Sequence, residues 1–117
     1  MNKLTAFVID CARPAELAEF YHTATGWPVE STGDDYATLT DGSVQLAFQQ
    51  IDGYEAPKWP SNAKQSHLDI QVSDLETAEK ELLALGATKP DFQPGGDDWS
   101  VYADPEGHLF CLVPKGE

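Results

Sequence analysis

The chain has 117 residues, of which 41% are hydrophobic and 23% charged, a composition typical of one globular domain with its own core. Seven lysines and arginines against 20 acidic residues give a formal net charge of −13, which argues against nucleic acid or an anionic membrane surface as a partner. We find no apolar run of membrane-spanning length and no signal peptide, so we expect a cytoplasmic protein whose two cysteines are reduced.

The first part of the chain predicts a strand, a helix and a hairpin. Residues 3–10 alternate, so that Lys3 and Phe7 share one face of a strand. Apolar residues at helical spacing, with a proline in the first turn and a glycine after the last, predict a helix over residues 14–25. Residues 36–50 then predict two strands around an Asp-Gly turn.

The second part repeats this order after residues 52–66, a stretch with Gly53, two prolines and mostly polar neighbours that predicts a linker. Residues 67–72 alternate as a strand, and residues 74–85 carry an apolar helical stripe that ends at a glycine. Residues 97–114 predict two strands around an Asp-Pro-Glu-Gly turn.

Two pairs of residues with the same spacing suggest that the two halves of the chain are repeats. Lys3 is followed by Asp10 and His67 by Asp74, each seven residues later, and each strand leads into a helix. We therefore predict one α+β domain over residues 1–117, made of two tandem βαβββ modules at about 1–51 and 67–117. Their strands are expected to form a curved mixed sheet around a cup-shaped cavity, lined by the faces that hold Lys3 and His67.

Three stretches resemble the vicinal oxygen chelate (VOC) superfamily, which includes glyoxalase I, extradiol dioxygenases, and fosfomycin and bleomycin resistance proteins. They are AEFYHTATGW over residues 18–27, HLDIQVSDLETAEKELLALGA over 67–87 and DPEGHLFCLV over 104–113. The resemblance runs from Lys3 to Val113 and implies a glyoxalase-like fold. It specifies the chemistry much less, because one fold hosts many functions.

The resemblance also implies where a metal would lie. In metal-using members of the superfamily four cavity positions bind one divalent ion, and here they fall on Lys3, Gln45, His67 and Cys111. Only His67 keeps a usual ligand type, because an ammonium group has no lone pair and an amide is a weak ligand. We therefore expect no metal cofactor; a Zn, Ni, Fe or Mn ion, if bound, would be held by His67, Gln45 and Cys111.

Each of these side chains also has an ordinary structural interpretation. His67 fits a relic of an ancestral ligand, bonded to Asp69 or to backbone, although it still faces the predicted cavity. Cys111 fits a small buried hydrophobe, since no basic residue neighbours it along the chain. Asp69 is less expected, because a carboxylate in an otherwise apolar strand needs a partner.

The predicted function is binding of a small aromatic or cationic molecule without chemistry. An excess of aromatic rings and the acidic charge favour this hypothesis. The alternative is a VOC-type lyase, isomerase or dioxygenase-like enzyme that uses His67, with or without a metal, and Asp69 as a second catalytic candidate. We also expect a homodimer that covers exposed sheet edges. The predicted ligand-binding residues are Lys3, Phe7, Trp27, Gln45, Trp59, His67, Asp69, Trp99 and Cys111.

Overall fold

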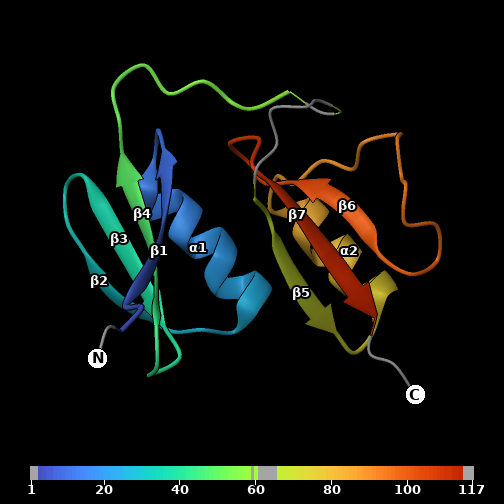
Figure 1. Ribbon diagram of the computed structural model, residues 1–117, viewed down its shortest axis with the longest axis horizontal. Helices are drawn as coiled ribbons and strands as arrows, with labels where there is room; N and C mark the ends of the chain where they lie inside the picture. Colours follow the sequence, from blue (N-terminus) through green and yellow to red (C-terminus); the bar gives the residue numbers. More distant parts are fainter. Residues whose placement is uncertain (1–2, 59, 61–65, 115–117) are drawn as a thin grey trace. The chain divides into compact units, whose positions relative to one another are not determined.

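The computed structural model describes residues 3–58, 60 and 66–114. The chain divides into two compact units, Met1–Glu55 and Ala56–Glu117, each containing one helix and one sheet (Figure 1). Within the described ranges, no helix has both the length and the apolar character needed to cross a membrane.

The first unit is a four-stranded sheet with one helix. Its strands lie in the order β1-β4-β3-β2, with β1 parallel to β4 and the other pairs antiparallel. The elements are β1 (Ala6–Cys11), α1 (Pro14–Thr25), β2 (Val29–Thr32), β3 (Tyr36–Thr40) and β4 (Gln45–Gln50). The helix and the hairpin predicted from the sequence are both present.

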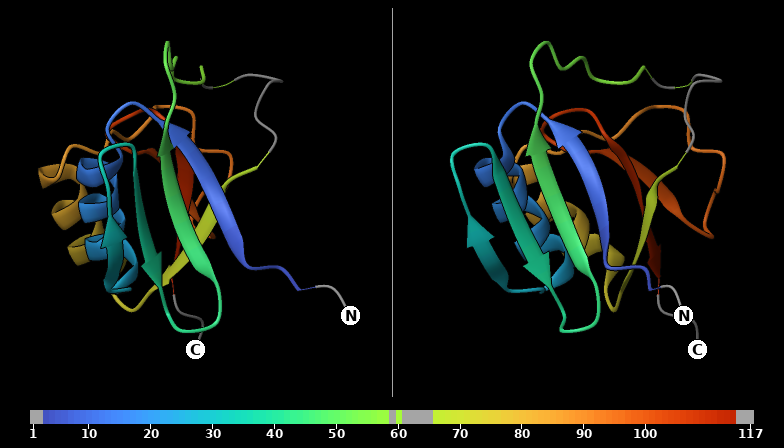
Figure 2. Two further views of the ribbon diagram at one scale, coloured as in Figure 1. Left: turned by 90° about the vertical axis from the view of Figure 1, so that its left-hand side faces the viewer. Right: turned by 60° about the vertical axis from the view of Figure 1, so that its left-hand side comes forward.

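Helix α1 covers one face of this sheet (Figure 2). Pro14 begins the helix, and Gly26 ends it in the left-handed conformation, with its N–H donating to the carbonyl of His22. The ring of Tyr21 stacks on that of Phe48 in β4, with centroids 5.5 Å apart, and both side chains are fully buried. This aromatic pair joins the helix to the sheet and forms the centre of the first core.

The second unit repeats the design with a smaller sheet. Its strands lie in the order β5-β7-β6, with β5 parallel to β7. The elements are β5 (Leu68–Val72), α2 (Leu75–Ala84), β6 (Ser100–Ala103) and β7 (Leu109–Pro114). A single bridge between Thr88 and Ala103 stands where the first unit has β2. The predicted α+β fold of tandem modules is confirmed, with one strand of the second module reduced to this bridge.

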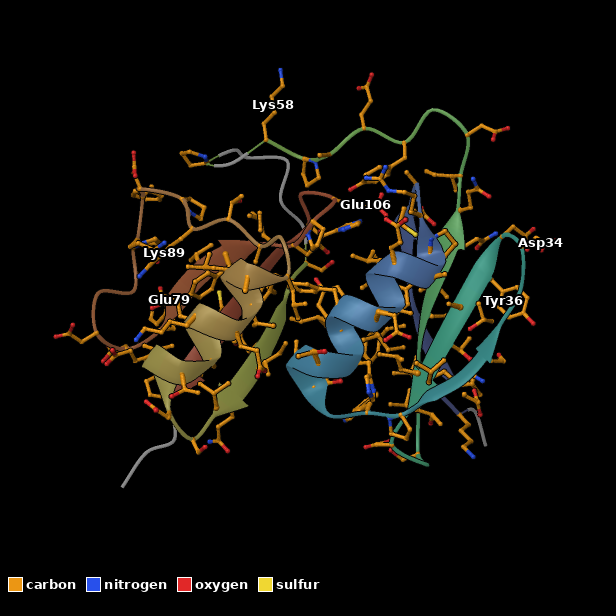
Figure 3. All side chains as sticks on the ribbon, turned by 180° about the vertical axis from the view of Figure 1, so that it is seen from behind. Asp34, Tyr36, Lys58, Glu79, Lys89 and Glu106 are labelled. Atoms are coloured by element: carbon orange, nitrogen blue, oxygen red, sulfur yellow. The ribbon has the colours of Figure 1, made fainter. Side chains whose placement is uncertain are left out.

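A polar contact joins α2 to its sheet. Tyr102 is fully buried, stacks on Phe110 with centroids 5.6 Å apart, and donates its hydroxyl hydrogen to Oε1 of Glu79 at 2.8 Å. Nζ of Lys89 lies 2.6 Å from the same oxygen of Glu79 (Figure 3). Hydrogen bonds from Lys89 and Tyr102 lower the pKa of Glu79, while burial, together with Glu79, raises the pKa of Tyr102.

The apolar stripe predicted for the second helix is only partly buried. Leu82 is 2% exposed, but Leu85, which caps the helix, is 45% exposed. Few apolar side chains of α2 are therefore removed from water, and the contact between Glu79 and Tyr102 gains importance for holding this helix.

One feature of the predicted repeat is wrong. Asp74 occupies the N-cap position of α2, whereas Asp10 lies inside β1 and the N-cap position of α1 is Arg13. The helices begin at residues 14 and 75, an offset of 61, and at this offset Ala6 rather than Lys3 corresponds to His67. The seven-residue match between Lys3–Asp10 and His67–Asp74 therefore does not align the two opening strands.

Candidate functional site

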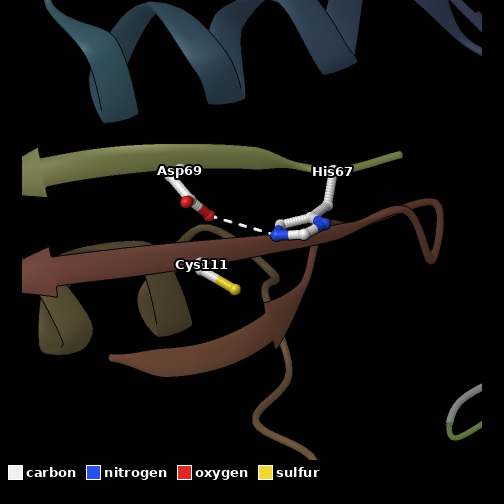
Figure 4. Close-up of side chains that lie close together, drawn as sticks. All are labelled: His67, Asp69 and Cys111. Atoms are coloured by element: carbon white, nitrogen blue, oxygen red, sulfur yellow. Dashed lines mark ion pairs between the residues drawn. The ribbon is translucent and has the colours of Figure 1, made fainter. Parts of the chain in front are cut away.

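Three side chains of the second unit meet at the start of its sheet. Nε2 of His67 lies 3.2 Å from Oδ1 of Asp69 (Figure 4). The thiol of Cys111 lies beside them, and the ligand atoms of the three residues are all within 4.8 Å of one another. The His67 and Asp69 side chains are 35% and 62% exposed, whereas Cys111 is 3% exposed. An imidazole, a carboxylate and a thiol thus share one small space.

Strand register explains why these residues meet. Asp69 in β5 is paired with Cys111 in β7, and Cys111 is paired with Val101 in β6. Paired residues lie on the same face of a sheet, so these three side chains line the face opposite the buried pair Tyr102 and Phe110. The alternation predicted for residues 67–72 therefore places His67 and Asp69 together.

These residues belong to a pocket of about 390 Å³ in the second unit. Its apolar lining consists of Pro94, Trp99, Val101 and Val113. Its polar lining consists of His67, Asp69, Asp98 and Cys111. The volume falls within the range of small-molecule sites, and two carboxylates give the pocket an acidic character.

The side chain of Gln93 holds one wall of this pocket in place. Its amide group donates to the carbonyl of Val101 at 2.9 Å and accepts from the N–H of Val101 at 2.8 Å. It also donates to the carbonyl of Pro90 at 2.8 Å. The Gln93 amide therefore makes with Val101 of strand β6 the two hydrogen bonds that a neighbouring strand would make. These bonds fix the loop that carries Pro94 and Trp99.

The position of Trp99 depends on a glycine in the same loop. A Cβ atom added to the buried Gly95 would fall 2.7 Å from Cγ of Trp99 and closer still to Cδ2 and Cε2. Because real Cβ atoms do not approach other atoms so closely, only glycine allows the indole ring to lie against the loop here. Trp99 itself remains 39% exposed at the pocket.

The predicted site residues fall into two groups. His67, Asp69, Trp99 and Cys111 all line the pocket of the second unit. The other four that the structure describes lie in the first unit, and their part in the site stays a prediction: Lys3, Phe7, Trp27 and Gln45. Trp59 lies outside the described residues.

In the first unit, Gln45 is engaged with a neighbouring side chain. Its amide donates to Oε1 of Glu30 at 2.6 Å, and the hydroxyl of Thr38 donates to the same oxygen at 3.2 Å. At the offset of 61 residues between the opening strands, Val8 corresponds to Asp69. Asp69 is paired with Cys111 and Val8 is paired with Ala47, so Ala47, rather than Gln45, is the counterpart of Cys111. The positions that correspond to His67 and Cys111 are thus both alanines, which bind no metal.

Several pocket residues escaped sequence reasoning. Val113 follows Cys111 by two residues, so strict alternation would have placed it in the pocket. Asp98 and Pro94 lie in an irregular loop, where no periodicity indicates direction. The same holds for Gln93, which supports the pocket wall without lining the pocket. Their roles come from contacts that the local sequence does not encode.

The fit of a metal to His67, Asp69 and Cys111 is partial. Zinc accepts nitrogen, oxygen and thiolate ligands, and tetrahedral bonds of 2.0–2.3 Å place ligand atoms roughly 3.6 Å apart. The 3.2 Å between His67 and Asp69 agrees with this geometry. The ligand atoms of the three residues are separated by up to 4.8 Å, which is more than the spacing around zinc, so at least one of these side chains must move inward to bind the ion.

The comparisons with known proteins agree with the fold. The sequence profile of a family described as Glyoxalase-like domain matches residues 6–113, so the chain belongs to this family. This confirms the resemblance to glyoxalase, bleomycin resistance and dioxygenase proteins of the VOC superfamily. A search of curated proteins gives no match.

Among solved structures, similarity is high in fold and low in sequence. A glyoxalase/bleomycin resistance protein/dioxygenase family enzyme from Burkholderia phytofirmans PsJN has a TM-score of 0.72 at 18% identity, covering 97% of this chain and 98% of that one. A possible glyoxalase from Bacillus cereus has a TM-score of 0.70 at 14% identity, with coverages of 97% and 99%.

A fosfomycin resistance protein is also similar in fold. This is a mutant of FosX from Listeria monocytogenes in complex with Mn(II) and 1S,2S-dihydroxypropylphosphonic acid, with a TM-score of 0.72 at 12% identity and coverages of 97% and 92%. At such identities the likeness concerns the fold alone.

Proposed function

We propose that the protein binds a small planar aromatic cation in the pocket of its second unit, without a metal. The observation that carries this proposal is the combination of an indole wall, Trp99, with the carboxylates of Asp69 and Asp98 in one pocket. An aromatic ring stacks on an indole, and a positive charge gains from both the ring face and the carboxylates. The net charge of −13 favours approach of a cation over an anion.

Matched ligands test this proposal directly. By isothermal titration calorimetry, N-methylquinolinium is expected to bind at least tenfold more tightly than neutral quinoline, and quinoline-2-carboxylate more weakly than both. Asp98→Asn should reduce the preference for the cation, because it removes a pocket charge and leaves the pair of His67 and Asp69 in place. Asp97→Asn, which changes the adjacent exposed carboxylate outside the pocket lining, is the matched control. Equal affinities for the cation and for quinoline would contradict the proposal.

A zinc-dependent function is the second candidate, favoured by the meeting of His67, Asp69 and Cys111. Three protein ligands and one open position are typical of catalytic zinc sites, and zinc there would polarise an oxygen atom of a substrate. The ligand atoms of the triad are spread more widely than zinc geometry requires, which favours the metal-free proposal.

Metal analysis separates the two candidates. After dialysis in micromolar zinc, the wild-type protein is expected to hold much less than one equivalent by mass spectrometry of metals. Stoichiometric zinc that is lost in both His67→Ala and Cys111→Ser would instead place the zinc-dependent function first.

We further propose a cytoplasmic homodimer. Strand β1 is at the edge of its sheet, with Phe7 53% and Val8 56% exposed, and no disulfide bond joins Cys11 and Cys111. Light scattering at micromolar concentration should give twice the mass of the chain, and a monomer mass would count against this proposal.

A further inference from the structure

We propose that Asp52–Gly53 is a site of spontaneous modification, at which the backbone of the folded protein is converted to a β-linked isoaspartate. The chain contains two Asp-Gly sequences, at residues 41–42 and 52–53, and both are exposed to solvent. The two sequences offer the same reacting groups, but the structure occupies these groups at the first site and leaves them open at the second. The inference depends on neither the pocket nor its ligand.

The reaction joins an aspartate side chain to the backbone nitrogen of the next residue. The nitrogen of Gly53 attacks Cγ of the protonated Asp52 carboxyl group and forms a C–N bond, while the carboxyl hydroxyl and the N–H proton leave together as water. Glycine favours this attack because no Cβ stands beside the nitrogen. The product is a five-membered succinimide ring.

Water then opens the succinimide in one of two ways. Addition at the former side-chain carbonyl restores aspartate, whereas addition at the former backbone carbonyl leaves the chain running through Cγ of Asp52 as isoaspartate. Water is the only co-reactant, no electron is gained or lost, and the final product has the mass and charge of the starting protein.

At Asp41–Gly42 both reacting groups are already hydrogen-bonded. Oδ1 of Asp41 accepts from the backbone N–H of Ser43 at 3.0 Å and from its hydroxyl at 2.7 Å. The N–H of Gly42, which holds the attacking nitrogen, donates to Oγ1 of Thr40 at 3.0 Å. The bonds from Ser43 also lower the pKa of Asp41, and an ionised carboxylate has no hydroxyl group to lose.

At Asp52–Gly53 these restraints are missing. Within the described part of the chain, no hydrogen bond or ion pair engages the Asp52 carboxylate or the N–H of Gly53. A Cβ added to Gly53 would meet nothing within 4 Å, so no other segment crowds this turn. The carboxyl group can therefore rotate towards the nitrogen without first breaking a contact.

The modification would enter the connection between the two units. Asp52 follows β4, and the first unit ends at Glu55. Isoaspartate adds the methylene carbon of the side chain to the backbone and leaves the former backbone carboxyl group as a side-chain carboxylate. The connection becomes longer, while the buried residues of both cores stay unchanged.

Ageing of the whole folded protein tests the proposal. After weeks in mildly acidic buffer, chromatography of proteolytic peptides separates isoaspartate from aspartate at equal mass, and fragmentation assigns the residue. Isoaspartate at Asp52 is expected to form about tenfold faster than at Asp41, because the hydrogen bonds of Asp41 must break first. In urea, where these bonds are lost, the two rates should become similar. Equal rates in the folded protein, or a difference that persists in urea, would overturn the proposal.

Two variants give an independent check on the same assay. Asp52→Glu should remove the modification, because the longer side chain would have to close a less favourable six-membered ring. Thr40→Val combined with Ser43→Ala removes the side-chain partners of Gly42 and Asp41, and should raise the rate at Asp41 severalfold while Asp52 serves as the internal control. The melting temperature shows whether this variant is folded. An unchanged rate at Asp41 in the folded variant would count against protection by these hydrogen bonds.

Discussion

Gly95→Ala is expected to lower the affinity for N-methylquinolinium about tenfold, because stacking on an indole contributes roughly 1–2 kcal/mol. The added methyl group would fall 2.7 Å or less from three atoms of the Trp99 ring, so the ring must leave its position at the pocket. Calorimetric titration of the variant against wild type measures the loss.

Two further variants show whether Gly95→Ala lowers the affinity for N-methylquinolinium by displacing the Trp99 ring. Trp99→Ala should weaken binding to a similar extent, and adding Gly95→Ala to it should cost little more, because both changes remove the same contact. Gly96→Asn is the matched control: Gly96 has φ +57, which asparagine tolerates, and an added Cβ there meets nothing within 4 Å. Unchanged affinity in Gly95→Ala, alongside a clear loss in Trp99→Ala, would show that the loop does not hold the indole.

Glu79→Leu is expected to lower the free energy of unfolding by about 1–3 kcal/mol at pH 7, because the fully buried Tyr102 hydroxyl loses its acceptor. The ion pair with Lys89 is lost as well, but Lys89 is 42% exposed, so solvent limits its share. Urea unfolding measures the change. Glu81→Leu, at an exposed position of the same helix, is the matched control and should cost little.

The cost of Glu79→Leu should also depend on pH. The pKa of Glu79 in the folded protein is lowered from 4.5, so its contribution to stability is complete above the ordinary value. As pH falls through the lowered value, the folded carboxylate takes up a proton and this contribution is lost. The difference between wild type and Glu79→Leu should therefore shrink as the pH falls below 4.5. A difference that stays the same in acid would mean that the charge of Glu79 does not stabilise the fold.

Much of the secondary structure could be predicted from the sequence. The first helix has the bounds expected from its proline, its apolar spacing and its glycine, because these signals act over a few residues. The alternation of residues 67–72 placed His67 and Asp69 on one face for the same reason. The offset of the repeat failed, because Asp10 resembles a helix cap in sequence and yet lies inside a strand.

The candidate site shows what short-range patterns miss. Residues 90–99 have no regular period, so nothing in the sequence indicates that Gln93 pairs with strand β6 or that Trp99 lies against Gly95. Likewise, Cys111 has only apolar neighbours along the chain. Strand pairing across 42 residues, between Asp69 and Cys111, brings it beside His67.

The sequence by itself therefore determined the class of fold, the order of the elements, the direction in which His67 and Asp69 point, and the acidic charge. Each of these depends on residue type and on spacing within one element. The tertiary structure alone decided that a thiol, an imidazole, two carboxylates and an indole line one pocket. The physical reason is that β5, β7 and the loop before β6 are distant in sequence, and only hydrogen bonds between strands and the amide of Gln93 bring them together.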